Sequence, residues 1–529
     1  MPRAKSHPSL SAKLRNLALP TAVIAITAAA TNAGASTLTG IPLAPWTSGE
    51  YQNEGRAISP DGKYVVGVSY FTNAVFTNGV NRPLRDGFFY DVANNVVIQP
   101  KPADAASAVP SILTGIGYRT DPVSGQKQLI LDGMELQYDG GIYVPLQANW
   151  MTADGGVTWG AQRCKNTWTD GQRLPTANSL GAVTGSDTFY TIIGDTAVDV
   201  NNQRGLFACR GWGTWDSVTD PAFGHDAFVI DNPDGGNMCG VAGVTGRAVG
   251  WYRDNWTYRP AQVNYNCAVD YPPPGGSGGT WEERYAKTWY FTGLANTNMG
   301  EAWSVSSDGN TIFGRSPTPT DTNWHGYKAT VTSAMNSLQS IQPLPDFSDT
   351  GGSTRLACPY GCSADGRYAV GVNYRGAEKA VLWDTGDANP TNWTVIDLTV
   401  RAASEGILGA WTNLTRAYSM GTNAAGNPVV TGWGRYFDGA GYNNRAFVMV
   451  VSNAAPRPQI TRITGAGTTS VTVNYTNTLA SKNYTLQYKT NLSTTNWYAA
   501  GTKSAAGTSD SQTDAAATGA QRYYRIYVP

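Results

Sequence analysis

The sequence predicts an all-β protein in which a β-propeller of about seven blades is followed by a small β-sandwich. Three observations lead to this prediction. A strand-and-turn unit recurs along most of the chain, the composition suits strands joined by tight turns, and the character of the sequence changes after Pro458. Only 14% of the residues are charged, while glycine contributes 60 residues, tyrosine 28 and tryptophan 17. Aromatic and β-branched residues favour pleated strands, and glycine favours turns.

The recurring unit is a turn of the form Ser-x-Asp-Gly, followed by a strand with a glycine near its middle. In such a turn the aspartate bonds nearby backbone N–H groups, and the glycine supplies a positive φ. The strand glycine marks a position where a side chain does not fit or where another backbone comes close. After a variable loop each unit continues with a further strand. Copies lie at 57–70, 151–160, 305–316, 362–374 and, in degenerate form, 422–433.

Strand-rich units that cannot bury both faces alone predict stacking or radial closure. Residues 36–455 span 420 positions. At roughly 40–50 residues per blade this length gives about seven blades, with six or eight left open. A β-solenoid is the structural alternative, but its repeats are shorter and more regular. Between residues 100 and 300 the units are long and divergent.

The pattern Ser-x-Asp-Gly-x-x-Val-Val-Gly, followed by Ala-Phe-x-Trp, resembles the HAF-type extracellular repeats of secreted bacterial proteins. The resemblance covers residues 57–98, 303–331, 361–398 and 417–451. It implies an exported, propeller-like domain. It implies no particular reaction, because the family is defined by its repeats.

A separate module follows the repeats. Pro456 and Pro458 read as a linker, and residues 456–529 carry strand patterns rich in Thr, Ser, Ala and Asn, which predict a small β-sandwich. The stretch from Tyr484 to Leu492, with Asn496-Trp497 and 522–525, resembles fibronectin type III-like or immunoglobulin-like modules. The resemblance implies a spacer or adhesion role. Burial habits of aromatic residues place Tyr488 and Trp497 in the module's core.

Residues 1–35 read as a signal peptide. Four basic residues precede an apolar stretch at 17–30, and Ala33-Gly34-Ala35 fits a cleavage site. A membrane anchor is the alternative, but the apolar run is interrupted by Pro20 and is shorter than the ~20 residues that a span needs. Cleavage near Ala35 would place residues 36–529 outside the cell, at its surface or in the periplasm. That part has 34 basic and 38 acidic residues, so its charge gives no reason to expect nucleic acid as a partner.

The cysteines are even in number and all follow residue 35, which in an exported chain predicts disulfides. Sequence does not fix their pairing. Pairing neighbours in order would join Cys164 to Cys209, Cys239 to Cys267, and Cys358 to Cys362. No paired C-x-x-C spacing indicates zinc, and we expect neither a metal nor another cofactor.

Signals for catalysis are weak, and no catalytic residue is predicted. His225 and His325 precede equivalent strands of the repeat, which favours a structural position over a catalytic one. The stretch Thr152–Trp159 matches the Asp box of sialidase-like propellers. That box is a hairpin turn away from the active site, so a match supports the fold. We interpret it as a variant of the common repeat turn.

The best binding candidates are aromatic and amide residues between the two main strands of a repeat, namely Trp251, Asn255, Trp256, Tyr258, Asn323 and Trp324. On one rim of a propeller such residues would stack on sugar rings and bond hydroxyls. The structural alternative, which tryptophan burial favours, is packing between blades. The sequence therefore favours a non-enzymatic scaffold that binds carbohydrate or an extracellular protein. A carbohydrate-active enzyme with a central site and a structural matrix or envelope component are the alternatives, and the oligomeric state is open.

Overall fold

The computed structural model describes two units, formed by residues 36–451 and by residues 1–35 with 452–529. Each unit is considered by itself. The described residues are 24–25, 36–44, 46, 49–77, 80–101, 110–120, 126–139, 142–163, 183–186, 189–195, 206–211, 226–230, 236–242, 247–253, 264–270, 287–297, 299–321, 323–331, 338–347, 357–374, 376–452, 459–465, 468–476, 483–491, 496–506, 509–518 and 522–527. For parts of the strands between 71 and 290 only the backbone is described.

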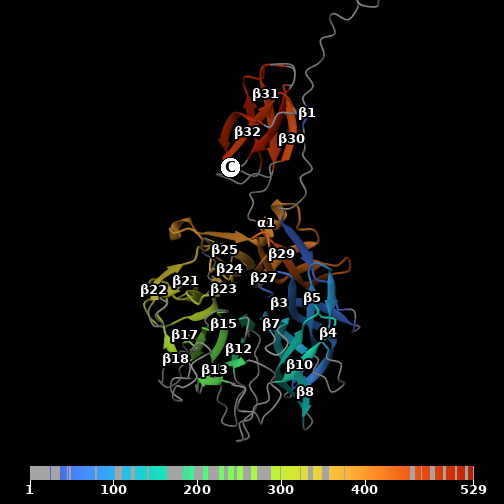
Figure 1. Ribbon diagram of the computed structural model, residues 1–529, viewed down its shortest axis with the longest axis vertical. Coiled ribbons are helices and arrows are strands. Elements are labelled where there is room, and N and C mark those ends of the chain that lie inside the picture. Colours follow the sequence, from blue (N-terminus) through green and yellow to red (C-terminus); the bar gives the residue numbers. More distant parts are fainter. Residues whose placement is uncertain are drawn as a thin grey trace, which may run out of the picture. The chain divides into compact units, whose positions relative to one another are not determined.

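The larger unit contains seven antiparallel four-stranded sheets within the described residues, which confirms the predicted propeller of about seven blades (Figure 1). The first four sheets are β3 (Glu50–Ile58), β4 (Tyr64–Thr77), β5 (Val80–Asp91), β6 (Val96–Ile98); β7 (Pro110–Thr120), β8 (Lys127–Asp139), β9 (Ile142–Thr152), β10 (Gly160–Arg163); β11 (Val183–Ser186), β12 (Phe189–Asp195), β13 (Leu206–Gly211), β14 (Asp226–Ile230); and β15 (Gly236–Val241), β16 (Ala248–Arg253), β17 (Asn264–Asp270), β18 (Lys287–Tyr290).

The other three sheets are β19 (Glu301–Val305), β20 (Thr311–Ser316), β21 (His325–Val331), β22 (Leu338–Pro343); β23 (Ala357–Cys362), β24 (Tyr368–Tyr374), β25 (Glu378–Asp384), β26 (Thr394–Asp397); and β27 (Trp411–Thr422), β28 (Pro428–Phe437), β29 (Tyr442–Val450) with β2 (Thr37–Gly40). A 3-10 turn, η2 (Pro390–Asn392), and a short helix, α1 (Leu398–Ser404), complete the unit's described elements. The carboxylate of Asp397 caps α1 by accepting from the N–H groups of Thr399 and Val400.

The two ends of the repeat domain meet in the last sheet. The N-terminal strand β2 pairs antiparallel with β29 and so supplies the outer strand of that sheet. The amide of Asn53, in β3, accepts from the N–H of Ala446 in β29 at 2.8 Å. Each sheet contacts the next one along the chain, and β3 contacts the last sheet. Segments some 400 residues apart therefore fix the first and last blades to each other.

The core lies between neighbouring sheets. Phe89 of the first sheet packs with Leu113, Leu131 and Trp150 of the second, and all four side chains are buried. Phe313 of the fifth sheet packs in the same way with Trp383 of the sixth. Because each blade buries one face against the next, the blades are stable only as a set.

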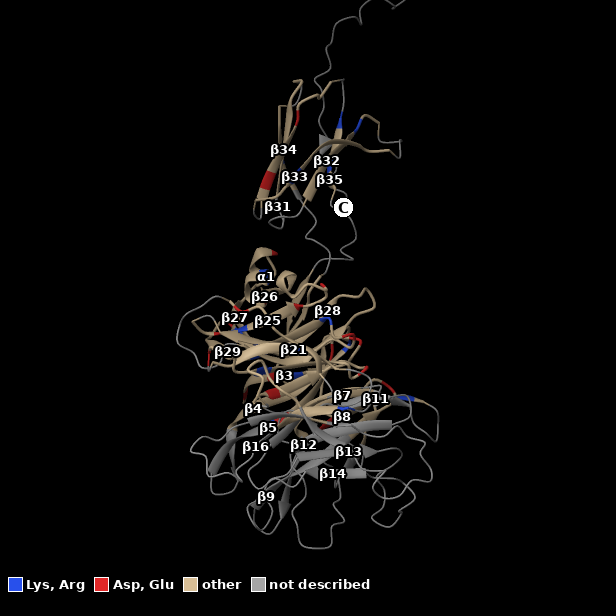
Figure 2. Cartoon of the chain, turned by 90° about the vertical axis from the view of Figure 1, so that its left-hand side faces the viewer, with Lys and Arg blue, Asp and Glu red and all other residues tan. Residues whose placement is uncertain are grey.

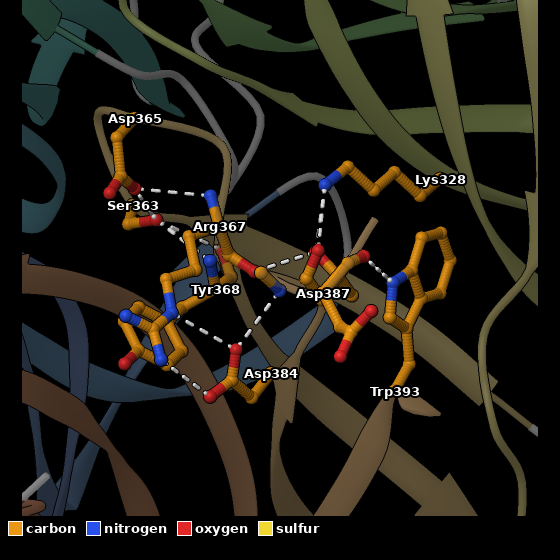
Figure 3. A network of polar contacts seen from close by, with 10 residues as sticks. Lys328, Ser363, Asp365, Arg367, Tyr368, Asp384, Asp387 and Trp393 are labelled. Carbon is orange, nitrogen blue, oxygen red and sulfur yellow. Dashed lines mark hydrogen bonds and ion pairs between the residues drawn. The ribbon is translucent and has the colours of Figure 1, made fainter. Parts of the chain in front are cut away.

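The predicted Ser-x-Asp-Gly turns form between the first and second strands of their sheets. In the copy at 363–366 the Ser363 hydroxyl donates to Asp365 at 2.5 Å, and Asp365 accepts from the N–H of Arg367 (Figure 3). Gly366 has a φ of +67°, as the turn requires. The same serine–aspartate bond occurs at Ser59–Asp61 and Ser306–Asp308. These bonds hold the carboxyl pKa below its ordinary value at Asp61 and Asp308, where they outweigh the opposing effect of burial.

Each turn is also tied to neighbouring strands. Arg367 forms two hydrogen bonds with Asp384 of β25, at 3.1 and 2.9 Å (Figure 3). From the preceding sheet, Lys328 reaches the carbonyl and hydroxyl oxygens of Thr385 and lies over the ring of Trp393. The turns of these two blades also meet directly, since the Ser307 N–H donates to the Ala364 carbonyl at 2.8 Å.

The Asp-box sequence lies elsewhere than predicted. Thr152–Trp159 connects β9 to β10, the third and fourth strands of the second sheet, whereas the repeat turns connect first and second strands. The turn itself has the hydrogen bond and the positive φ of the other copies, with Thr152 donating to Asp154 at 2.7 Å and Gly155 at a φ of +72°, so the repeat turn recurs here at another place in the blade. Asp154 accepts from Thr152 and Thr158, which lowers its pKa, and the Trp159 ring packs edge-on against Phe89 of the first sheet. This turn anchors the contact between the first two blades.

The smaller unit is the predicted β-sandwich. One sheet contains β30 (Gln459–Thr464), β31 (Val471–Thr476) and β34 (Ser509–Asp514). The other contains β32 (Asn483–Lys489), β33 (Tyr498–Ser504) and β35 (Tyr523–Tyr527), with the dipeptide β1 (Ile24–Ala25) paired parallel to β35. Leu486, Val473 and Tyr524 are buried between the sheets, and Tyr488 packs against them. Trp497 was expected in this core. Instead, its ring packs against the side-chain cations of Lys489 and Arg525, which cover it.

Among the described residues, no helix is long and apolar enough to cross a membrane.

Candidate functional site: a ring of bulge residues

The first strands of the sheets contact one another around the propeller and form its inner wall (Figure 1). Six of them carry a β-bulge at the equivalent place, where one extra residue interrupts the pairing with the second strand. We call these six residues the bulge ring, and they are Arg56, Thr114, Cys239, Trp303, Tyr360 and Tyr418. A bulge redirects a side chain, and bulges are common beside functional sites.

The repeated strand glycine explains the bulge. In β24, a Cβ on Gly371 would lie 1.9 Å from the carbonyl oxygen of Cys358, two residues before the bulge residue Tyr360. Gly432 would meet the oxygen of Arg416 at 1.9 Å, and Gly67 that of Glu54 at 2.0 Å. Equivalent contacts occur at Gly133 and Gly314. The prediction that this glycine marks a close backbone approach is therefore confirmed at these positions, where the bulge creates the approach, and is wrong for Gly160, whose Cβ would meet no atom within 4 Å.

The bulge side chains of successive sheets touch. The guanidinium of Arg56 lies over the Tyr418 ring, 4.7 Å from its centroid. The Tyr418 and Tyr360 ring centroids are 5.4 Å apart, and those of Tyr360 and Trp303 are 5.1 Å apart. Cys239 packs in the same cluster as Trp303. The contacts run through five blades, so residues far apart in sequence form one buried aromatic and cationic cluster.

Three arginine–glutamate pairs accompany the ring. Arg56 pairs with Glu54 at 2.6 Å, and Arg315, from β20, pairs with Glu301 at 2.5 Å. Arg416 makes two parallel bonds to Glu378, at 2.6 and 2.5 Å. Each arginine thus meets a carboxylate, so the cations beside the bulge ring are paired within the protein.

Burial acts on the ring's titratable groups. It raises the pKa of Tyr360 well above its ordinary value and that of the Cys358 thiol to about 12. Burial alone would lower the pKa of Arg315, but Cys358, Glu301 and Tyr360 outweigh it and raise the value. At neutral pH the tyrosine and the thiol are therefore uncharged, and the arginine is a cation.

Three donors of the bulge ring are unsatisfied among the described residues, and the Nε of Arg56 is one of them. Trp303 is 8% exposed, and its indole Nε1 has no hydrogen-bond partner among the described residues. The Thr114 hydroxyl likewise has no hydrogen-bond partner among the described residues. A buried donor without a partner is costly, by ~1–3 kcal/mol, and such groups are often satisfied by water or ligand.

Two predicted binding residues reach this site. Trp324 lies under the guanidinium of Arg315, 5.3 Å from it, and is partly buried. Trp251, at the end of β16, packs against the cluster of Cys239 and Trp303. Asn323 binds the carboxylate of Asp321 through its backbone N–H. Asn255, Trp256 and Tyr258 lie outside the described residues, as does His225.

His325 lies next to Trp324, between two carboxylates. Its Nδ1 is 2.8 Å from Asp346 and its Nε2 is 3.0 Å from Asp321. The hydrogen bond with Asp346 chiefly raises the histidine pKa. With both ring nitrogens occupied, His325 ties the loop before β21 to the segment that precedes β23, in agreement with its predicted structural position.

The predicted disulfide between Cys358 and Cys362 does not form. Both are free thiols. The two residues belong to one strand, where a separation of four residues is ~13 Å, whereas a disulfide needs Cα atoms within ~7 Å. Cys164 and the side chains of Cys209 and Cys267 lie outside the described residues, so the other two pairings stay predictions.

A second polar cluster lies at the start of β3. Burial raises the pKa of Glu50 to about 7, against the lowering effects of Ser69, the Ala44 N–H and Arg445. Burial also raises the pKa of the neighbouring Asp86. Arg445 is itself partly buried, and its pKa is lowered by burial. Glu50 therefore carries a carboxyl group that is half-protonated near neutral pH.

Among the described residues no group of three or more His, Cys, Asp or Glu side chains is arranged to hold a metal ion. The sequence matches no protein-family model and no curated protein. The resemblance to HAF-type repeats and to fibronectin type III-like modules therefore stays a prediction.

Solved structures similar to this chain are β-propellers or contain them. The propeller domain of the Trilobed protease from Pyrococcus furiosus is 12% identical, with 74% of this chain and 95% of that one covered and a TM-score of 0.38. Sqt1 of Chaetomium thermophilum bound to the N-terminus of ribosomal protein L10 is 10% identical, with coverages of 80% and 94% and a TM-score of 0.35. A GH32 β-fructofuranosidase of Bombyx mori is 9% identical, with coverages of 76% and 89% and a TM-score of 0.28. These low values transfer no activity to this chain.

Proposed function

We propose that this chain is an exported propeller whose bulge ring binds a carbohydrate outside the cell or at its surface. The aromatic side chains of the bulge ring lie together with three arginine–glutamate pairs, whose groups can donate to and accept from hydroxyl groups. Sugars are bound by such pairs of stacking and hydrogen-bonding groups. The export part of the proposal rests on the pattern of residues 1–35.

The observation that carries the proposal is the unpartnered indole N–H of Trp303. It belongs to a residue that contacts both Tyr360 and Arg315, so a ligand hydroxyl bound there would meet aromatic and charged groups together. Trp324, on the other side of Arg315, would extend the same surface.

The test is a glycan-array screen of the full chain, followed by calorimetric titration of the best glycan into wild type and Trp303→Phe. The variant keeps a ring but loses the N–H donor, so the affinity should fall about 3- to 10-fold. Trp393→Phe is the matched control, because its indole N–H already bonds the Asp387 carbonyl outside the ring, and it should bind normally. An array without any bound glycan, or a Trp303→Phe variant with wild-type affinity, would refute the proposal.

A second candidate function, a glycoside hydrolase, has one specific observation in its favour. Glu50, with a pKa of about 7, and its neighbour Asp86 form a carboxyl pair in which one member keeps its proton near neutral pH. Glycoside hydrolysis uses two carboxyl groups, one of which acts as an acid. Release of nitrophenol from aryl glycosides by wild type, and its loss in Glu50→Gln, would establish this function. If a bound glycan remains uncleaved after incubation with the protein, the hydrolase function is refuted and only the binding proposal remains.

A further inference from the structure

The three arginine–glutamate pairs beside the bulge ring differ in how far solvent reaches them. In the pair of Arg315 and in that of Arg56, each side chain is at most 15% exposed. The side chains of Arg416 and Glu378 are 32% and 36% exposed. A dissolved ligand can therefore touch the Arg416–Glu378 pair directly, whereas the other two pairs are nearly closed to it.

The accessible pair lies beside the aromatic groups of the ring. Arg416 lies in β27, two residues before the bulge residue Tyr418, and Glu378 begins β25 in the preceding sheet. Burial lowers the pKa of Arg416, but the bonds to Glu378 and the nearby Tyr360 and Tyr418 outweigh it and raise the value. Trp433 lies directly opposite Arg416 on β28 and is partly exposed. The pair thus joins two blades at the accessible side of the ring.

The hydrogen-bonding capacity of this pair is only partly used. Nε and Nη2 of Arg416 donate to the two carboxylate oxygens of Glu378, at 2.6 and 2.5 Å. Nη1 has no hydrogen-bond partner in the described part of the chain, and each carboxylate oxygen can accept a further bond. N–H donors and acceptor oxygens therefore lie side by side where a ligand can reach them.

The charges beside the ring cancel. Each of the three arginines meets one glutamate, and Figure 2 shows basic and acidic positions interspersed over the described strands of this unit. An acidic ligand would have to compete with Glu378 for Arg416, and a cationic ligand would have to compete with Arg416 for Glu378. Charge complementarity therefore selects an uncharged ligand.

We propose that the Arg416–Glu378 pair determines the specificity of the bulge ring by binding two hydroxyl groups on neighbouring carbons of an uncharged sugar. One hydroxyl accepts from Nη1 of Arg416, and the other donates to a carboxylate oxygen of Glu378. Because the pair already holds the guanidinium in place, little side-chain freedom is lost on binding. This specificity rests on the proposed function of the ring and names the class of glycan, which is neutral and has adjacent free hydroxyls.

The first experiment applies the full chain to an array of neutral, uronic-acid and sulfated glycans and titrates the best neutral glycan calorimetrically. We expect the bound glycans to be neutral ones with adjacent free hydroxyls. Monodeoxy analogues of the recognised sugar should lose about 10-fold in affinity at two neighbouring positions and little elsewhere, because each loss leaves one group of the pair without its partner. This series uses the wild type alone, so it needs no folded variant.

The second experiment changes the pair itself. Arg416→Lys keeps the positive charge but loses the two-bond contact, and Glu378→Gln removes the anionic acceptor. Each should lower the affinity about 10-fold or more. Arg367→Lys is the matched control, because Arg367 also makes two bonds to a carboxylate, that of Asp384, but outside the bulge ring (Figure 3). It should change the affinity by less than about 2-fold, and melting curves of all three variants establish that they fold.

Binding of acidic glycans only would overturn the specificity, as would wild-type affinity in Arg416→Lys and Glu378→Gln, or deoxy losses that do not fall at neighbouring positions. An array without bound glycans would overturn the proposed function as well. If the affinity falls in Trp303→Phe but not in the two pair variants, the proposed function stands and the specificity of Arg416 and Glu378 is refuted. If it falls only in the pair variants, the pair binds the sugar without Trp303, and the proposed function is refuted instead.

Discussion

The inner strands β3, β19 and β23 each carry a bulge residue and run within a few positions into a Ser-x-Asp-Gly turn. At the turns the residues are alike, and so are their hydrogen bonds, from Ser59–Asp61 to Ser363–Asp365. At the bulges the backbone is alike but the residues differ, with Arg56, Trp303 and Tyr360 at one position. The turns therefore repeat both their residues and their backbone conformation, whereas the bulges repeat only the backbone conformation and carry different side chains.

This difference predicts that the chain tolerates change in the bulge side chains better than in the glycines and turns that create their positions. Four predictions test it.

The largest loss of stability is expected for Gly371→Ala. Its Cβ would lie 1.9 Å from the carbonyl oxygen of Cys358, a backbone atom that cannot move without separating β23 from β24. We expect a loss of about 3 kcal/mol or more in unfolding free energy, measured by urea denaturation. Gly160→Ala, in strand β10 with no atom within 4 Å of the new Cβ, is the control and should change it by less than about 0.5 kcal/mol. Similar losses for both variants would show that the close approach is unimportant.

The second prediction concerns pH. The pKa of Glu50 is raised by burial from 4.5 to about 7, so its protonated form is favoured in the folded protein. The stability that it adds is complete below pH 4.5 and is lost as the pH rises through 7, by about 2 kcal/mol. The melting temperature of the wild type should therefore fall between pH 4.5 and 7, and this fall should be smaller in Glu50→Gln.

His325 acts with the same sign at higher pH, because its pKa is also raised and its contribution disappears as the imidazolium loses its proton. The fall of the melting temperature above pH 6.5 should therefore remain in Glu50→Gln and become smaller in His325→Gln. An unchanged profile between pH 4.5 and 7 in Glu50→Gln would contradict the assignment.

The third prediction compares two turn glycines. Gly366 and Gly426 have φ values of +67° and +77°, but a Cβ on Gly366 would also meet Thr311 at 2.7 Å, while that on Gly426 meets nothing within 4 Å. Gly426→Ala should cost only the strain of the left-handed conformation, about 1 kcal/mol. Gly366→Ala should cost about 1 kcal/mol more, as differential scanning fluorimetry of the two variants would show. The reverse order would mean that Thr311 moves freely.

The smallest effect is expected inside the bulge ring. Tyr418→Phe keeps the ring that Arg56 and Tyr360 contact and removes a hydroxyl that accepts from Trp433 at 3.4 Å. We expect a loss below about 1 kcal/mol. A loss as large as that of Gly371→Ala would show that the bulge residues are structural parts of the core and would weaken their assignment to a site.

Much of the fold was predictable because its signals are local. Each turn closes within five residues, so the residue types at Ser363, Asp365 and Gly366 are enough to predict its conformation. The strand glycines predicted a close backbone approach, and Gly67, Gly371 and Gly432 confirm it. The estimate of six to eight blades came from the length of residues 36–455, and the C-terminal sandwich from the change of composition and the strand pattern after Pro458.

The candidate site was predicted only at its margin. Trp251 and Trp324 were named from their loops, but the core of the site, with Trp303, Tyr360 and Arg315, was missed. These residues lie in strands whose sequence pattern does not differ from that of ordinary buried strands. A possible signal was their equivalent distance from the repeat turn, three residues before the serine at Arg56, Trp303 and Tyr360.

By itself, then, the sequence determined the repeated turns and the class of fold, because these depend on hydrogen bonds, backbone angles and residue preferences within a few residues, while it left the number of blades between six and eight. Tertiary structure decided which residues meet. The bulge lifts one side chain from each inner strand, and radial packing brings those of successive sheets into contact, from Arg56 to Trp303. It also excluded the Cys358–Cys362 bond and placed the Trp497 ring beside Lys489 and Arg525. These outcomes depend on contacts between segments far apart in the chain, for which a single sequence carries no local signal.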